Sequence, residues 1–430
     1  MSRGWLCILC ATILFMKDVQ IKKLIEAEKK RAKRVINLIA SENYVSKDVL
    51  EALGSELTNK YAEGYSGKRY YGGNGVVDKI EDLCIERALK LFGLNKNEWH
   101  VNVQPLSGSP ANLAVYTGLF APKAIDIKVS ASGGDASVVA KAKIMGMMLD
   151  HGGHLTHGHK VSATGKFWTQ VPYGVEATTE TLNYDQIMEY AIKEKPQIIV
   201  AGYTAYPRIV DWKRLREIAD ASGAIFMVDM SHLAGLVAGK AYPSPFPYAD
   251  IVTTTTHKTL RGPRSAIIFV KKDAREMDKK IDRAVFPGLQ GGPHINQIAG
   301  VAVALREADT PTFKKYAKQV IKNAAVLADE LRNRGWRLIS GGTDSHLILV
   351  DTWNAGKKNE KGAGAISGKE ASDRLEKAGI IVNKNAIPFD TRPPTDPSGI
   401  RLGTAGETTR GKKEKDFRLI AKKIDEILRR

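Results

Sequence analysis

The chain has 430 residues, 43% of them hydrophobic and 26% charged, which is ordinary for a soluble globular protein of about two domains. The net charge is +18, but the basic residues are scattered along glutamate-containing segments, which favours solvated helix faces; attraction of anionic substrates is the functional alternative. No apolar stretch is long enough to span a bilayer, and three cysteines argue against a disulfide framework and fit a reducing cytoplasm.

The N-terminus carries a short apolar run, Trp5 to Phe15, behind a single arginine. A signal peptide would add a small-residue cleavage site, but charged residues and a second methionine, Met16, follow instead. We therefore interpret residues 1–15 as an over-extended start in preference to a signal peptide, with Met1 and Met16 as the alternative first residues. Cys7 and Cys10 form a C-x-x-C pair, but no second pair or histidine lies nearby, so a metal or redox role is not supported.

Apolar periodicity predicts alternating helices and strands along the middle of the chain. A helix is predicted from Val19 to about Asn37, and another from Trp212 to Ala221 between two β-rich runs. Strand, helix and strand in succession indicate a parallel sheet with crossover helices. The predicted strands are Gln197 to Ala201, Ile225 to Asp229, Ile251 to Thr256 and Ser265 to Val270.

The C-terminal third changes to a mixed pattern after a helix from Thr312 to Arg334. Its further predicted elements are strands at His346 to Val350 and Ile380 to Val382, and helices at Gly368 to Ala378 and Glu414 to Leu428. We predict an N-terminal helical arm (16–50), a large α/β domain (51–310) and a smaller α+β domain (311–430). Residues 123–143 are small, polar and weakly patterned, which predicts a surface loop.

The sharpest local feature is the run Thr-Thr-Thr-Thr-His-Lys-Thr-Leu-Arg-Gly-Pro at residues 253–263. It places Lys258 at the end of a buried strand, where an unpaired ammonium is costly. A Schiff base with a carbonyl cofactor is one solution. The alternative is a lysine whose stem is buried and whose charge reaches solvent.

Two neighbouring features suit a pyridoxal-phosphate site. Asp229 ends the preceding strand, where a carboxylate can keep a pyridinium nitrogen protonated. Ser107, Gly108 and Ser109 lie between a strand and a helix, where free backbone N–H groups can bind phosphate. A core-edge aspartate and an ordinary turn or helix cap remain the alternatives. The run lacks a Walker pattern, so an NTPase is not supported.

Residues 150–159 contain four histidines, which suggests a metal. The run is rich in glycine, however, and no cysteine or spaced acidic cluster complements it, so we predict no metal and expect a histidine stacked on a flat cofactor ring. Arg401 lies between Gly399 and Gly403, where it can offer a planar fork to a carboxylate. A structural ion pair is the alternative for Arg401.

Together these runs resemble the serine hydroxymethyltransferase family, pyridoxal-phosphate enzymes of fold type I, from about Ile21 onward. Blocks 38–44, 58–65, 67–73 and 398–404 also carry the resemblance. It implies a mostly parallel seven-stranded sheet with helices on both faces and a smaller C-terminal α+β domain. It also implies reversible transfer of the serine hydroxymethyl carbon to tetrahydrofolate, giving glycine and 5,10-methylenetetrahydrofolate, with pyridoxal phosphate bound as a Schiff base.

The resemblance assigns roles around the cofactor. Lys258 forms the Schiff base, Asp229 pairs with the pyridinium nitrogen and His154 stacks on the ring. His232 contacts the phenolic side, and Thr204 replaces the usual serine hydroxyl. The remaining cofactor-binding residues are Ser107, Gly108 and Ser109 at the phosphate, Thr255, His257, and Gly291 and Gly292 of the partner subunit.

For the substrates, the resemblance makes Arg401 the clamp on the serine carboxylate, with help from Ser41. Tyr61 and Tyr71 complete the site across a dimer interface. Glu63 is the candidate proton carrier for the serine hydroxyl and folate; a structural acid is the alternative. The predicted folate wall is Leu149, Gly153, Leu155 and Asn385.

Three departures from the family pattern stand out. Residues 123–143 lengthen a connection that is shorter in relatives, and folate access would change if they packed over the cleft. Gly75 replaces an acid, and Ala405-Gly406 replace Pro-Ala, so reduced activity is a possible consequence of these two.

Two rival functions follow from the same residues. A folate-independent, threonine-aldolase-like enzyme would share Lys258, Asp229 and Arg401 but need neither Glu63 nor Asn385. A basic RNA-binding protein on this fold would show clustered basic residues with exposed aromatics. We expect a cytoplasmic homodimer, with a tetramer as the alternative, that binds neither a specific nucleic acid nor a membrane.

Overall fold

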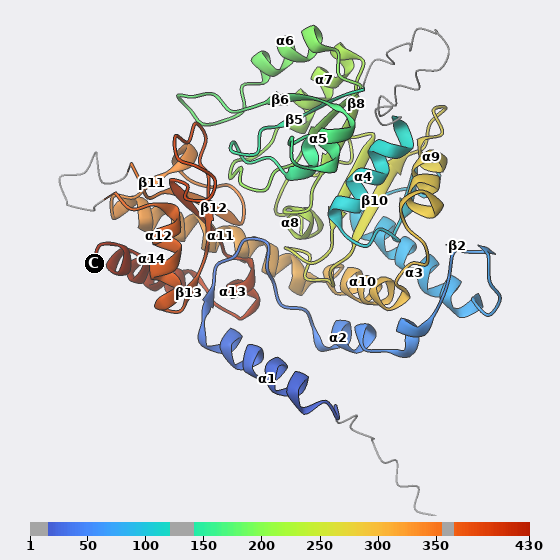
Figure 1. Ribbon diagram of the computed structural model, residues 1–430, viewed down its shortest axis with the longest axis horizontal. Coiled ribbons are helices and arrows are strands. Elements are labelled where there is room, and N and C mark those ends of the chain that lie inside the picture. Colours follow the sequence, from blue (N-terminus) through green and yellow to red (C-terminus); the bar gives the residue numbers. More distant parts are fainter. Residues whose placement is uncertain (1–15, 121–141, 355–364) are drawn as a thin grey trace, which may run out of the picture.

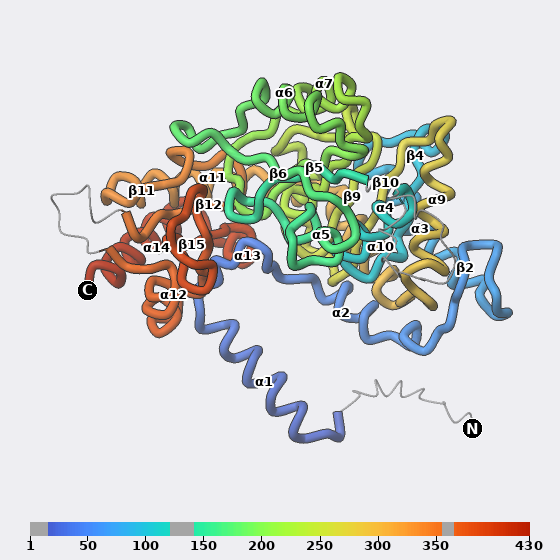
Figure 2. The backbone as a smooth tube through the Cα atoms, turned by 45° about the horizontal axis from the view of Figure 1, so that its top comes forward, coloured from blue at the N-terminus to red at the C-terminus, as the bar shows by residue number. Residues whose placement is uncertain are grey.

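The computed structural model describes residues 16–120, 142–354 and 365–430 (Figures 1 and 2). Its centre is a seven-stranded sheet in the order β4-β10-β9-β8-β7-β5-β6. Strand β10 is antiparallel to β4 and β9, while the other neighbours run parallel, which confirms the predicted mostly parallel sheet. The strands are β4 (Trp99–Asn102), β5 (Lys143–Met147), β6 (Thr169–Tyr173), β7 (Ile198–Ala201), β8 (Ile225–Asp229), β9 (Ile251–Thr255) and β10 (Ala266–Lys271).

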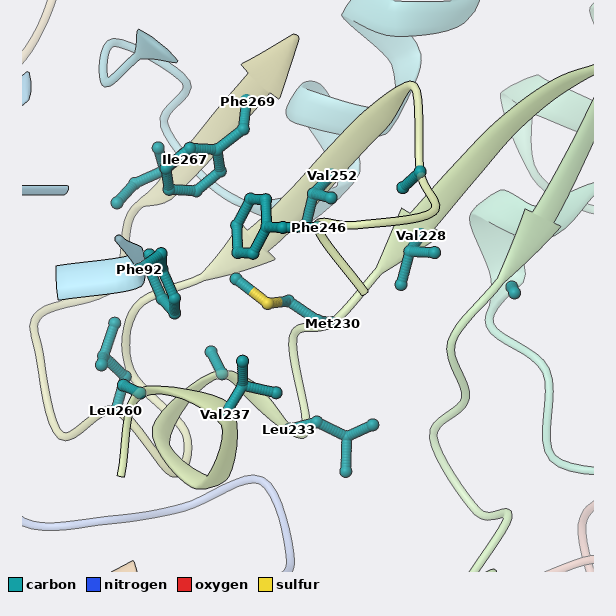
Figure 3. Packing of buried hydrophobic residues seen from close by; sticks show 14 of the residues in the cluster. Phe92, Val228, Met230, Leu233, Val237, Phe246, Val252, Leu260, Ile267 and Phe269 are labelled. Atoms are coloured by element: carbon teal, nitrogen blue, oxygen red, sulfur yellow. The ribbon is translucent and has the colours of Figure 1, made fainter. Parts of the chain in front are cut away.

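Helices cover both faces of this sheet, because alternate residues of its strands point to opposite sides. Val228 of β8 belongs to one buried cluster, and the preceding residue, Met227, belongs to another on the opposite face. Figure 3 shows part of the first cluster, in which the rings of Phe92, Phe246 and Phe269 lie close together and Met230 lies between Phe92 and Val228. Burial on both faces explains why the central strands β7, β8 and β9 consist mostly of apolar or β-branched residues.

The helices follow their sequence signals closely. Helix α7 (Trp212–Ser222) begins after Asp211, whose side chain accepts from the Arg214 amide, and ends at Gly223, which has a φ of 72°. The other helices are α1 (Val19–Arg34), α2 (Lys47–Leu53), α3 (Gly75–Phe92), α4 (Gly108–Leu119), α5 (Ala163–Phe167), α6 (Tyr184–Glu194), α8 (Ala234–Ala238), α9 (Met277–Arg283), α10 (Ile295–Ala308), α11 (Pro311–Asn333), α12 (Gly368–Lys377), α13 (Ala405–Thr409) and α14 (Glu414–Leu428).

A second sheet lies in the C-terminal third, in the order β11-β12-β15-β14. Helices α11, α12 and α14 pack against it through a separate apolar cluster that includes Leu327, Leu375 and Phe417. Its strands are β11 (Arg337–Leu338), β12 (Leu347–Asp351), β14 (Asn383–Asn385) and β15 (Gly399–Gly403). The boundaries that we drew between the arm, the large domain and the small domain stay a prediction.

The N-terminal arm joins this C-terminal unit by a two-stranded pairing. Strand β1 (Ile36–Asn37) runs parallel to β13 (Ile380–Ile381). Before it, α1 projects away from the rest of the protein in both views and has no buried residue (Figures 1 and 2). The helix prediction to Asn37 was therefore wrong at its end, because the last residues are extended and pair with β13.

The unusual segment 123–143 lies almost wholly outside the described residues, as do residues 1–15 with Cys7 and Cys10. Its last residue, Lys143, already begins β5, so the predicted loop was too long at that end. The other departures lie at helix starts: Gly75 begins α3 and Ala405 begins α13. In the described ranges, no helix has the length and apolar character needed to cross a membrane.

Candidate active site

A cavity of about 330 Å³ opens beside the ends of β8 and β9, at the start of α4. Twelve of the predicted site residues line it, although they come from the arm, the large sheet and the C-terminal sheet. These are Ser41, Ser107, Gly108, Ser109, His154, Thr204, Asp229, His232, Thr255, His257, Lys258 and Arg401. Four lining residues had no predicted role: His157, Tyr203, Ser231 and Arg264.

Lys258 lies three residues beyond β9, and its amine donates to Thr255 Oγ1 over 2.8 Å. Burial lowers the pKa of Lys258 to about 8; Arg401 and Arg264 act in the same direction, and Asp229 opposes them. An appreciable fraction of this amine is therefore neutral near neutral pH, and the neutral form is the one that attacks a carbonyl.

Asp229, the last residue of β8, is held by three donors. Its Oδ2 accepts from Asn112 Nδ2 at 2.9 Å and from His157 Nε2 at 3.2 Å, and its Oδ1 accepts from the Ser231 amide at 3.1 Å. Burial alone would raise the pKa of Asp229, but His157 and the other donors hold it far below its usual range. The carboxylate is therefore ionised, as pairing with a protonated ring nitrogen requires.

The residues predicted to bind the cofactor's phosphate lie at the start of α4. Ser107 is the N-cap residue but its side chain makes no capping bond, so its hydroxyl is available to the cavity. A Cβ on Gly108 would lie 2.7 Å from Thr255 Cγ2, so only glycine allows this close approach of helix and strand. Free amides and hydroxyls at a helix N-terminus, with Arg264 on the same wall, suit a phosphate group.

The ring of His154 lines the cavity, and its hydrogen bonds and pKa define its protonation state. Its Nδ1 accepts from the Thr156 amide at 3.2 Å and lies 2.7 Å from Thr156 Oγ1. Because a backbone amide can only donate, Nδ1 carries no proton. Burial lowers the pKa of His154 to about 4, so the ring is neutral with its proton on Nε2. A flat, neutral ring is what stacking on a cofactor requires.

His232 is buried on the same wall and contacts a second histidine. Its Nδ1 lies 3.1 Å from His346 Nε2, and the two rings stack at 5.3 Å between centroids. Burial and the nearby Lys258 and Arg401 cations hold the pKa of His232 well below its ordinary value. Burial likewise lowers the pKa of His257 to about 3. The cavity therefore gains no positive charge from these histidines at neutral pH.

Arg401 reaches the cavity from β15. Its Nε donates to Asn383 Oδ1 at 3.0 Å and its Nη1 donates to the Thr204 carbonyl at 2.6 Å. Thr204 is itself held by Gly153, whose carbonyl accepts from its Oγ1 at 2.8 Å. Within the described residues Arg401 forms no ion pair with a carboxylate, and burial lowers its pKa to about 10. A half-buried guanidinium in this state is suited to receive a substrate carboxylate.

Five predicted residues form a second cluster that does not line the cavity. Glu63 lies at its centre, with its carboxylate oxygens 3.4 Å from the Tyr61 hydroxyl and 3.3 Å from the Tyr71 hydroxyl. The two tyrosines are 60% and 51% exposed. Gly291 and Gly292 lie beside them, against Glu63 and the Tyr61 ring. In a single chain, these predicted site residues therefore lie in two separate places, the cavity and the cluster around Glu63.

The four predicted folate residues do not meet in one cavity. Leu149 lines a cavity of about 390 Å³, whereas Leu155 lines another of about 440 Å³. The side-chain amide of Asn385, at the end of β14, donates to the backbone carbonyl of the next residue, Ala386. A Cβ on Gly153 would lie 2.0 Å from the Met147 carbonyl oxygen, so this glycine serves the packing of the histidine loop.

The histidines of the loop bond to different partners, although the His154 and His157 rings lie 5.6 Å apart between centroids. His151 accepts from the Val175 amide, His154 bonds to Thr156, and His157 bonds to Asp229. In the part of the chain that the structure describes, no group of three or more histidine, cysteine or acidic side chains could hold a metal ion. Of the lining residues without a predicted role, His157 lay in the histidine run that was already singled out, and Arg264 follows the Gly-Pro turn directly.

The sheet, the half-buried lysine beyond β9 and the carboxylate at the end of β8 define a pyridoxal-phosphate-dependent transferase of fold type I. A sequence profile described as "Serine hydroxymethyltransferase" matches residues 14–424. The chain belongs to the serine hydroxymethyltransferase family, whose members use pyridoxal phosphate to exchange one carbon between serine and tetrahydrofolate.

Two relatives show how far this similarity extends. A serine hydroxymethyltransferase of Desulfotalea psychrophila is 51% identical over 417 residues, which cover 97% of this chain and 90% of that protein. One of Koribacter versatilis is 51% identical over 413 residues, which cover 96% and 89%. The similarity therefore spans both sheets and the arm.

Proposed function

We propose that this chain transfers the hydroxymethyl carbon of serine to tetrahydrofolate, with Lys258 as the residue that carries pyridoxal phosphate. The observation that supports it best is the single cavity that gathers Lys258, Asp229, His154 and Arg401. The two relatives, both named serine hydroxymethyltransferase, support the same reaction. No feature of the site favours the aldolase or the RNA-binding alternative.

The lining residues fit the cofactor chemically. The α4 start with Ser107 to Ser109 suits the phosphate, and the ionised Asp229 suits a protonated ring nitrogen. The neutral His154 suits the face of the ring, and His232 the phenolic side, with Thr255 and His257 beside them. Bound pyridoxal phosphate supplies an electron sink that stabilises negative charge on the substrate α-carbon.

The protein's own groups then bind, orient and move protons. Arg401 receives the serine carboxylate, with the Ser41 hydroxyl on the same wall, and so fixes the orientation of the bonds at the α-carbon. Lys258, with its lowered pKa, releases and takes up a proton near neutral pH. Asp229 keeps its negative charge throughout, because its three donors hold its pKa low.

We further propose a homodimer in which a second copy supplies the Glu63 cluster. The two tyrosines of this cluster, Tyr61 and Tyr71, are exposed, and the hydroxyl of each donates to Glu63. The apolar residues of α1 are likewise exposed in one chain, which supports a partner at this end of the molecule. In the dimer, Glu63 is the group that carries a proton between the serine hydroxyl and folate, with Gly291 and Gly292 at the cofactor.

Folate is proposed to lie along Leu149, Gly153, Leu155 and Asn385. One contact beside the cofactor cavity supports this: the Gly153 carbonyl accepts a hydrogen bond from Thr204, which lines that cavity. We also propose a cytoplasmic location, supported by the small number of cysteines and by the buried free thiol of Cys84.

The test is an absorption spectrum of the purified protein with glycine, with and without tetrahydrofolate. We expect a new long-wavelength band that requires both ligands, together with turnover of serine to glycine. The same band with glycine alone, and cleavage of β-hydroxy amino acids without folate, would indicate the aldolase instead. A protein that takes up no pyridoxal phosphate and shifts with RNA would overturn the proposal.

A further inference from the structure

Asn112 lies directly behind two of the groups that the proposed function places around the cofactor ring. It belongs to α4, is 1% exposed and does not line the cavity. Its Nδ2 donates to Asp229 Oδ2 and to Thr156 Oγ1, each at 2.9 Å. Its Oδ1 accepts from Thr253 Oγ1 at 2.7 Å.

These three bonds determine the orientation of the amide. Both Nδ2 hydrogens are used, and Oδ1 has its own donor. A flipped amide would place Oδ1 against the Asp229 carboxylate, where two acceptors repel each other. Thr253 therefore fixes one end of Asn112, and the other end presents hydrogens to Asp229.

The second Nδ2 hydrogen of Asn112 acts on the His154 ring through Thr156. Because Asn112 donates to Thr156 Oγ1, the threonine's own hydroxyl proton is free to go to His154 Nδ1, which lies 2.7 Å away. This agrees with the acceptor state of Nδ1 that the Thr156 amide requires. One buried amide thus orders both the carboxylate and the histidine ring.

The bonds also distinguish the two oxygens of Asp229. Oδ2 accepts from Asn112 and His157, whereas among the described residues the only donor to Oδ1 is the Ser231 amide. We propose that Asn112 is a positioning residue of the transferase reaction: it leaves Asp229 Oδ1 as the acceptor for the cofactor's ring nitrogen and, through Thr156, fixes the His154 ring. This inference rests on the proposed function, because it acts through Asp229.

The test compares two cofactors on the apoprotein by equilibrium binding: pyridoxal phosphate and its deaza analogue, in which CH replaces the ring nitrogen. Wild type is expected to prefer pyridoxal phosphate. Asn112→Leu keeps the approximate shape but removes all three bonds, and we expect the preference to fall at least about tenfold, as for the loss of a hydrogen bond to a charged group. A ratio of affinities is insensitive to a general loss of folded protein.

Two further variants complete the design. Asn323→Leu is the matched control, because Asn323 is another fully buried amide, bonded to Thr408 and Lys412 in the C-terminal unit. Asn323→Leu should prefer pyridoxal phosphate over the deaza analogue by the same ratio of affinities as wild type. Thr253→Val removes only the bond to Asn112 Oδ1, and a smaller loss in the same direction is expected. If Asn112→Leu does not fold, Thr253→Val decides the question.

The outcomes separate this inference from the proposed function. A wild type that prefers pyridoxal phosphate, with Asn112→Leu and Thr253→Val both within twofold of it, overturns the role of Asn112 alone. An equal loss of preference in Asn323→Leu also overturns it. A wild type that binds the two cofactors equally shows that Asp229 does not serve the ring nitrogen, and the inference then falls with that assignment.

Discussion

Arg401 Nη1 donates to the backbone carbonyl of Thr204 at 2.6 Å and so joins β15 to the loop after β7. The bond to Asn383 Oδ1 holds the other side of the guanidinium. Two neutral acceptors therefore fix the plane of the group, while its charge stays uncompensated within the described residues. A planar cation held in this way is prepared for a carboxylate before the substrate arrives.

Arg401→Lys is expected to raise the KM for serine by about 100-fold, because lysine cannot bond Asn383, Thr204 and a carboxylate from one plane. Asn383→Ala should raise it by about tenfold, since it removes one neutral hydrogen bond that orients the group. Steady-state kinetics with varied serine measure both. A KM within threefold of wild type for Arg401→Lys would contradict the role.

Cofactor capture by the apoprotein should depend on pH through Lys258, whose pKa is lowered to about 8. The neutral amine is the reactive form, so the capture rate should fall about tenfold per unit below pH 8 and level off above it. Arg264→Gln removes a cation that lowers this pKa, so the midpoint should move upward. Stopped-flow absorbance gives the profile, and Arg418→Gln, an exposed residue paired with Glu330, is the control.

Complementation tests whether the active site is shared between two copies. Lys258→Ala and Glu63→Gln should each lose most activity when expressed alone. In a refolded equal mixture, half the dimers are mixed and each holds one intact site of two, so about a quarter of wild-type activity should return. Measured activity no greater than the sum of the separate variants would place both residues in one chain's site.

Substitution of Gly202, the residue after β7, tests how closely this part of the chain approaches β8. Its φ is 101°, and a Cβ there would lie 1.9 Å from the Asp229 carbonyl oxygen. Gly202→Ala should lower the free energy of unfolding by about 3 kcal/mol, from backbone strain plus the clash. Gly223→Ala is the matched control, with a φ of 72° and open space, and should cost about 1 kcal/mol. Urea denaturation of both apoproteins measures the difference.

Strands β7 to β10 could be predicted because they are short apolar or β-branched runs, and two of them have a clear end: β7 is followed by Gly202 and β8 ends at Asp229. The run Ile225 to Asp229 matched β8 at both ends, and it placed Asp229 correctly at the edge of the cavity. Lys258 could be recognised as unusual for the same reason, since a charged residue rarely follows a fully buried strand.

Other parts of the site depend on contacts that no local pattern contains. Asn112 is critical only because α4 covers β8 and β9, and strand order is not visible in periodicity. The separation of Glu63 from the cavity likewise depends on the path of residues 58–73 over the surface. Ser41 was placed by resemblance, because its position depends on the pairing of β1 with β13.

That pairing has a consequence for synthesis of the protein. Residues 36–41 leave the ribosome early, yet β13 and β15, against which they pack, are made more than 300 residues later. Ala40 lies so close to Gly403 that a Cβ on Gly403 would come within 2.3 Å of the Ala40 Cα. Nascent chains that do not yet contain β15 therefore cannot close the wall that holds Ser41 and Arg401, so enclosure of the cofactor has to wait until this strand is made.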